Sequence, residues 1–207
     1  MLQDPPEGDI TAWNFFDVQS VGGGFLTHNS TLRFFFSGRS HAHRNQSALS
    51  AASSFYYSNA STGTGTLRRD GFAALHRSGD AVGIVTTFML QFDDGDTLHV
   101  NANTTAGKLI VQVADESGSA LPHLSFDQCD GLSNVDSTDE IVTWAGEPSL
   151  LATVAHGTPF QLTFQLHGEA RLYSFWIGRS DCGPASRGFV AAGSADVPGP
   201  RDERCEH

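Results

Sequence analysis

The chain has 207 residues and 39% hydrophobic residues, which is enough apolar material for a packed core and excludes wholesale disorder. Its net charge of −11, with only 12 Lys plus Arg, argues against nucleic acid and against anionic membranes, because both bind clustered cations. Neutral ligands such as carbohydrates, and cations such as calcium, remain compatible with this charge. The 22 glycines favour short strands joined by turns over long helices.

Residues 1–66 contain few apolar clusters and long polar connections. A Gly triplet at 22–24 is expected to form a turn, and the Ser/Thr/Gly-rich segment 58–66 is expected to be a connection. Three strands cannot close an independent core, so we expect this segment to be the edge of a larger β structure. The expected strands are 13–18, 32–36 and 55–57.

From residue 67 to 178 the pattern is regular, with about eight candidate strands separated by turn residues. Apolar side chains alternate with polar ones, most clearly at Phe160, Leu162, Phe164 and Leu166. This pattern predicts an antiparallel β-sandwich of the jelly-roll type. Residues 179–207, rich in Gly, Pro and charge, are expected to be a disordered tail. The expected strands are 71–75, 82–92, 97–103, 108–114, 123–126, 140–144, 159–166 and 171–177.

Localisation stays open. The opening, MLQDPPEGDI, has neither the basic nor the apolar region of a signal peptide, so a secreted protein would need a signal upstream of it. Four Asn-x-Ser/Thr sequons are typical of a secreted glycoprotein, although a chain rich in Ser and Thr also produces such triplets by chance. The three cysteines have no metal-ligand spacing and do not indicate a redox compartment.

Several stretches together resemble one family. "GTLRRDGFAAL", "GIVTTFMLQF" and "RLYSFWIG" resemble the C-terminal β-sandwich of proteins related to glycoside hydrolase family 32, and "FFFSGRS" is similar to their last propeller blade. The resemblance implies a five-bladed β-propeller followed by a sandwich, with 1–66 as a partial blade and linker and 67–178 as the sandwich domain. It also implies that the catalytic carboxylates belong to the propeller, so none can be assigned to this sequence.

Arg68, Arg69 and Asp70 form the most unusual charged cluster in the chain. A guanidinium beside a carboxylate makes a directional contact, and Asp-Gly is a turn dipeptide. The resemblance places the cluster between propeller and sandwich. We therefore expect it to fix a domain junction; contact with a ligand is the alternative.

Two binding sites are further hypotheses. Carbohydrates bind on exposed aromatic rings, and the sandwich candidates are Trp144, Tyr173 and Trp176; core packing competes with this interpretation. Calcium needs six to eight oxygen ligands, which an acidic loop can supply, although a solvated loop explains the same composition. The candidate calcium ligands are Asp127, Asp130, Asp136 and Asp139, and no other cofactor is expected.

These observations favour a non-catalytic C-terminal accessory module of a glycoside-hydrolase-like protein, with a structural role and a carbohydrate as a candidate ligand. Its other expected partner is the propeller domain that the resemblance implies. One alternative is a fragment of a fructosidase-like hydrolase that is active only when full-length. Another is a stand-alone lectin-like or calcium-dependent binding module.

Overall fold

The structure, a computed structural model, describes residues 17–39, 60–77, 79–92, 95–149, 153–179 and 191–192. Every strand pair in these residues is antiparallel, and they contain no helix. The predicted all-β, antiparallel fold is therefore confirmed. The chain divides into two compact units, residues 1–69 and 70–207, which are considered separately below.

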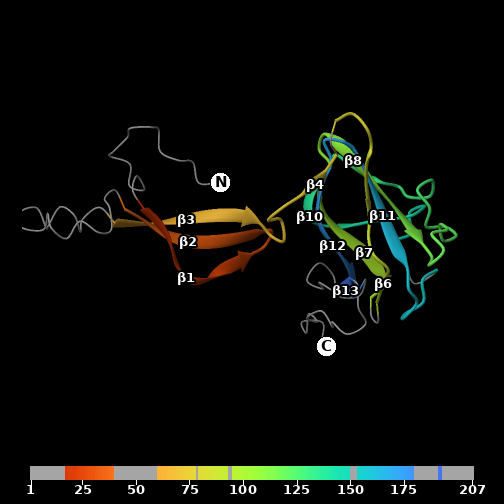
Figure 1. Cartoon of the computed structure of the whole chain (residues 1–207), viewed down its shortest axis with the longest axis horizontal. Coiled ribbons are helices and arrows are strands. Elements are labelled where there is room, and N and C mark those ends of the chain that lie inside the picture. Colours follow the sequence, from red (N-terminus) through yellow and green to blue (C-terminus); the bar gives the residue numbers. More distant parts are fainter. Residues whose placement is uncertain are drawn as a thin grey trace, which may run out of the picture. The chain divides into compact units, whose positions relative to one another are not determined.

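The first unit contains one three-stranded sheet with the order β1-β2-β3 (Figure 1). Its strands are β1 (Asp17–His28), β2 (Thr31–Arg39) and β3 (Ala60–Arg68). β2 and β3 pair without interruption along their whole length, whereas the pairing of β1 with β2 shifts register between Ser20 and Phe25. β3 is therefore a regular edge strand, and β1 is an irregular one.

Two expectations for this unit are wrong. Residues 22–24 do not form the turn; they lie within β1 at the register shift, where glycine tolerates a bulged backbone. The turn lies instead at Asn29, whose φ of 50° is the left-handed conformation that Asn adopts readily. The segment expected as a connection forms β3, because its backbone pairs with β2 along its whole length. The expected strand 55–57 lies outside the described residues.

The second unit contains two four-stranded sheets that pack as sandwich-like layers (Figure 1). The first has the order β10-β7-β12-β4 and the second the order β5-β11-β8-β9, while β13 pairs with β6. The strands are β4 (Leu75–His76), β5 (Gly83–Thr86), β6 (Leu90–Gln91), β7 (Thr97–Asn103), β8 (Gly107–Ala114), β9 (Leu132–Ser133), β10 (Asp136–Ile141), β11 (Gln161–Gly168), β12 (Arg171–Gly178) and β13 (Ala191–Ala192).

The core of this unit lies between the two sheets. β7 contributes Leu98 and Val100, while β8 and β11 contribute Val111 and Phe164 from the opposite layer, and all four are fully or almost fully buried. The Phe164 ring contacts Phe175 of β12, with centroids 5.2 Å apart. Apolar residues that alternate along a strand therefore lie on its core side, as predicted for β11.

The segment between β8 and β10 differs from its prediction. The expected strand 123–126 is a series of turns: His123 has a φ of 66°, and the Cys129 amide bonds back to the Ser125 carbonyl at 3.1 Å. The acidic segment expected as a loop contains β9 and β10. β10 forms despite its polar side chains because its backbone pairs with the central strand β7.

Candidate functional site

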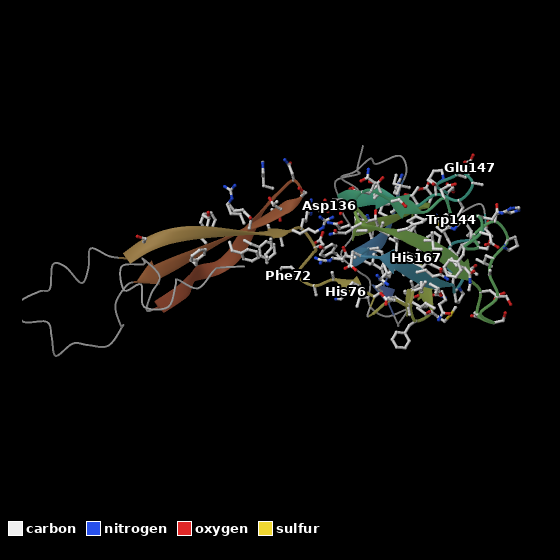
Figure 2. All side chains as sticks on the ribbon, turned by 90° about the horizontal axis from the view of Figure 1, so that it is seen from above. Phe72, His76, Asp136, Trp144, Glu147 and His167 are labelled. Carbon is white, nitrogen blue, oxygen red and sulfur yellow. The ribbon has the colours of Figure 1, made fainter. Side chains whose placement is uncertain are left out.

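Trp144, a predicted carbohydrate platform, lies in the sandwich core. Its side chain is labelled in Figure 2 beside Glu147, with which it shares a tight turn. Only 3% of Trp144 is exposed, and its indole Nε1 donates a hydrogen bond to the Val111 carbonyl oxygen at 3.2 Å. The indole therefore satisfies its one donor inside the protein, and its ring packs with the core residues.

Trp176 and Tyr173 lie on β12, where the pairing with β7 shifts register between Leu172 and Ser174. This bulge places Ile177 in the core and Trp176 on the outer face of the first sheet, the side that points away from the core. Trp176 is only 6% exposed and stacks on His99, with ring centroids 5.4 Å apart and planes 17° apart. Tyr173 is half-buried at the bulge. The three predicted aromatic residues do not share one exposed surface.

The outer face of the first sheet carries a buried polar network that the sequence did not indicate. His99 Nδ1 lies 2.7 Å from Asp139 Oδ1, and His99 Nε2 lies 2.9 Å from Thr97 Oγ1. The side chains of His99 and Asp139 are only 4% and 16% exposed. Thr97 Oγ1 is also 3.2 Å from the Gly178 carbonyl oxygen. Four groups from three strands thus lie in series within hydrogen-bonding distance of one another.

The direction of these hydrogen bonds follows from their chemistry. A carboxylate only accepts, so His99 Nδ1 carries the proton that it shares with Asp139. When the ring is neutral, Nε2 accepts from the Thr97 hydroxyl; when the ring is charged, Nε2 donates and the hydroxyl turns to Gly178. A hydroxyl, an imidazole and a carboxylate in this order also form catalytic triads. Here Thr97 is buried, so the arrangement holds the three strands together rather than presenting a nucleophile.

The four predicted calcium ligands do not form a single site. In the part of the chain that the structure describes, no three His, Cys, Asp or Glu side chains are gathered to hold a metal ion. Asp139 bonds His99, whereas Asp127 is exposed in the turn before β9 and Asp136 is exposed at the start of β10 (Figure 2).

Asp130 organises the turn around Trp144. Its Oδ2 accepts a hydrogen bond from the Thr143 hydroxyl at 2.5 Å and another from the Gly146 amide at 2.9 Å. These bonds, the hydroxyl first, hold the pKa of the Asp130 carboxyl below its usual value. The neighbouring Cys129 is a buried free thiol, and burial raises its pKa. Both residues stabilise the local fold.

The predicted junction residues lie at the boundary between the two units. Arg68 ends β3, and the Arg69 amide donates to the Ser30 carbonyl at 2.8 Å, so both belong to the first unit. Asp70 begins the second unit with a φ of 51°. The division between Arg69 and Asp70 falls within the "LRRDGF" motif, and the role of these side chains in fixing the junction stays a prediction.

A different surface of the sandwich presents polar groups to solvent. The outer face of the second sheet carries half-exposed Gln112, Thr163, Gln165 and His167 on β8 and β11 (Figure 2 labels His167). Thr163 Oγ1 lies 3.3 Å from Thr86 Oγ1 of β5. Alternation with the core residues of β11 could have located this face, because every second residue from Gln161 to His167 is polar.

An exposed aromatic residue lies beside this polar face. Phe88, in the connection that follows β5, is 81% exposed. The adjacent Thr87 is anchored to β11, since its hydroxyl accepts from the Leu162 amide at 3.1 Å and its carbonyl accepts from the Gln161 amide group at 2.7 Å. The backbone next to Phe88 is therefore held in place, while the ring is available to solvent.

No family model matches this chain, and no curated protein or solved structure matches it. The described residues include no helix that is long and apolar enough to cross a membrane. The observations therefore define an all-β protein with sandwich-like layers, and they do not identify a family.

Proposed function

We propose that this chain is a non-catalytic accessory module of a glycoside-hydrolase-like protein, with a structural role and a carbohydrate contact on its sandwich. The resemblance of the "LRRDGF" motif and of the strands that follow it supports this proposal. The observation that carries it is the exposed apolar surface of the three-stranded sheet, which suits a unit that packs against further protein.

That sheet presents apolar side chains on both of its faces. Phe25, which is 50% exposed, packs against Phe34 with ring centroids 5.4 Å apart, and Leu67 lies on the same face. Leu26 and Phe35 are exposed on the opposite face. Three strands are too few to bury such side chains by themselves. Packing against further β-sheet would remove this area from water.

The carbohydrate contact is best supported at Phe88. An exposed aromatic ring stacks on the apolar face of a sugar, and nearby amides and hydroxyls bond the sugar hydroxyls. Phe88 supplies the ring, and the neighbouring polar face supplies Gln112, Thr163 and Gln165. Trp144 and Trp176, by contrast, are covered by their own chain.

Native affinity electrophoresis tests the carbohydrate contact. We expect gels that contain soluble inulin, levan, xylan or mannan to retard the wild-type protein for at least one polysaccharide, and Phe88→Ala to abolish the retardation. Phe72→Ala is the matched control, because Phe72 is also an exposed phenylalanine of the sandwich. Equal loss in both variants, or no retardation in any gel, would overturn the proposed contact.

A reducing-sugar assay on the same polysaccharides tests the non-catalytic role. We expect no release above the blank from the purified chain. Release that co-purifies with the protein and scales with its concentration would show that the chain is an enzyme.

A further inference from the structure

We propose that β3 pairs with β3 of a second copy of this chain, antiparallel and centred on Thr64, to form a six-stranded sheet across a homodimer. This inference goes beyond the proposed function. It rests on the edge of the three-stranded sheet, whereas the accessory role rests on the faces of that sheet.

Among the described strands, β3 is a regular edge strand of the three-stranded sheet. It pairs with β2 from Ala60 to Arg68 without a register shift, and no other described strand pairs with it. An edge strand directs the N–H and C=O groups of every second residue away from its sheet, where they can pair with another strand. The other edge, β1, is less suited to this pairing because its register is broken between Ser20 and Phe25.

The sequence of β3 favours antiparallel pairing with β3 of a second copy. Residues 62–66 read Thr-Gly-Thr-Gly-Thr, which is the same in both directions. Antiparallel pairing about Thr64 therefore places Thr62 opposite the second copy's Thr66 and Gly63 opposite its Gly65. Thr therefore meets Thr and Gly meets Gly at every central position, and each contact of Thr62 with Thr66 occurs twice, as in a two-fold interface.

Both faces of the joined strands are compatible with this register. On one face the threonines form a ladder, and cross-strand Thr–Thr pairs stabilise antiparallel sheets. On the other face the glycines carry no side chain that could clash with the second copy, and the Phe36 ring lies 3.7 Å from the position of a Cβ added to Gly65, which is ordinary van der Waals contact. The residues from Ala60 to Leu67 include no charged side chain, so like charges do not oppose one another there. The one charged residue of the strand, Arg68, lies opposite the second copy's Ala60 and therefore not opposite the second copy's Arg68.

Disulfide formation at chosen positions tests both the dimer and its register. Directly opposed residues in antiparallel strands have Cα atoms about 4.5–5.5 Å apart, within the range that a disulfide spans. In a Cys182→Ser/Cys205→Ser background, where Cys129 is buried, we expect Thr64→Cys to form a covalent dimer under mild oxidation. Thr62→Cys alone should stay monomeric on a non-reducing gel, but should cross-link with a size-tagged Thr66→Cys.

Light scattering after size exclusion gives an independent measurement on the unmodified protein. We expect a concentration-dependent dimer, and Thr64→Pro should shift it to monomer because proline cannot donate a backbone hydrogen bond. Circular dichroism checks that each variant keeps its β structure. A monomer at all concentrations together with no Thr64→Cys cross-link would overturn the proposal. Equal self-cross-linking at all three positions would overturn the proposed register.

Discussion

Replacing Asp139 with alanine tests the buried network on the first sheet. The change removes the carboxylate oxygen that lies 2.7 Å from Nδ1 of His99, whose side chain is only 4% exposed. A buried donor left without its acceptor costs about 1–3 kcal/mol. Asp139 is itself 16% exposed, so water can reach part of the vacated position, and we expect the lower half of this range, about 1–2 kcal/mol.

Urea unfolding followed by tryptophan fluorescence measures this cost. Two of the three tryptophans, Trp144 and Trp176, lie in the sandwich, and Trp176 stacks on His99, so their fluorescence reports the unit that is perturbed. With a slope of about 1.5 kcal/mol per molar urea, a loss of 1.5 kcal/mol lowers the midpoint by about 1 M. The matched control is Glu116→Ala, which removes an exposed carboxylate from a turn and should change stability by less than about 0.5 kcal/mol.

A double-mutant cycle shows whether the groups act together. Thr97→Val removes the partner of His99 Nε2 and should also destabilise the fold. Because both changes act on one imidazole, we expect the double variant to differ from the sum of the single variants by at least about 0.5 kcal/mol. The reasoning fails if Asp139→Ala matches Glu116→Ala, or if the two losses are additive.

Three further variants test other parts of the sandwich by the same unfolding assay. Trp144→Phe keeps an aromatic ring but removes the indole N–H and part of the buried volume, and should lower stability by at least about 1–2 kcal/mol; no change would mean that the bond contributes nothing. Gly107→Ala should lower the free energy of unfolding by about 3 kcal/mol, because the added Cβ would collide with the backbone of the facing strand. Gly118→Ala should lower it by about 1 kcal/mol, because the Cβ there meets open space and only the positive φ is unfavourable. The pKa of Asp130 is lowered in the folded state, so its contribution is present above its unfolded pKa and is lost as pH falls through the folded value. Asp130→Asn should therefore lose less stability than wild type in acid, and equal acid sensitivity would contradict this.

Local pattern predicted much of the fold correctly. The strand from Thr97 to Asn103 was predicted with the bounds that the structure gives, because apolar and polar residues alternate along it. β3 was not predicted, and the expected strand 140–144 covers only the last two residues of β10, since neither strand carries an apolar pattern and each forms by backbone pairing with a neighbouring strand. Local sequence does not reveal such a neighbour.

The contacts of the candidate site residues could not be predicted from the sequence. Asp139 was interpreted as a calcium ligand within an acidic run, yet it bonds a histidine forty positions away in the sequence. Trp144 and Trp176 were equivalent as aromatic candidates, but the structure places one in the core and stacks the other on His99. The exposed ring is Phe88, in a short connection without any pattern that would single it out.

The sequence by itself determined the all-β class and the inward side of β8 and β11, because both follow from a period of two residues along a strand. The tertiary structure alone decided which polar groups meet and which aromatic rings face solvent. Those outcomes depend on strand order, on pairing register and on the bulge between Leu172 and Ser174. One residue of register reverses the face of every side chain that follows it, and register is set by strands distant in the sequence.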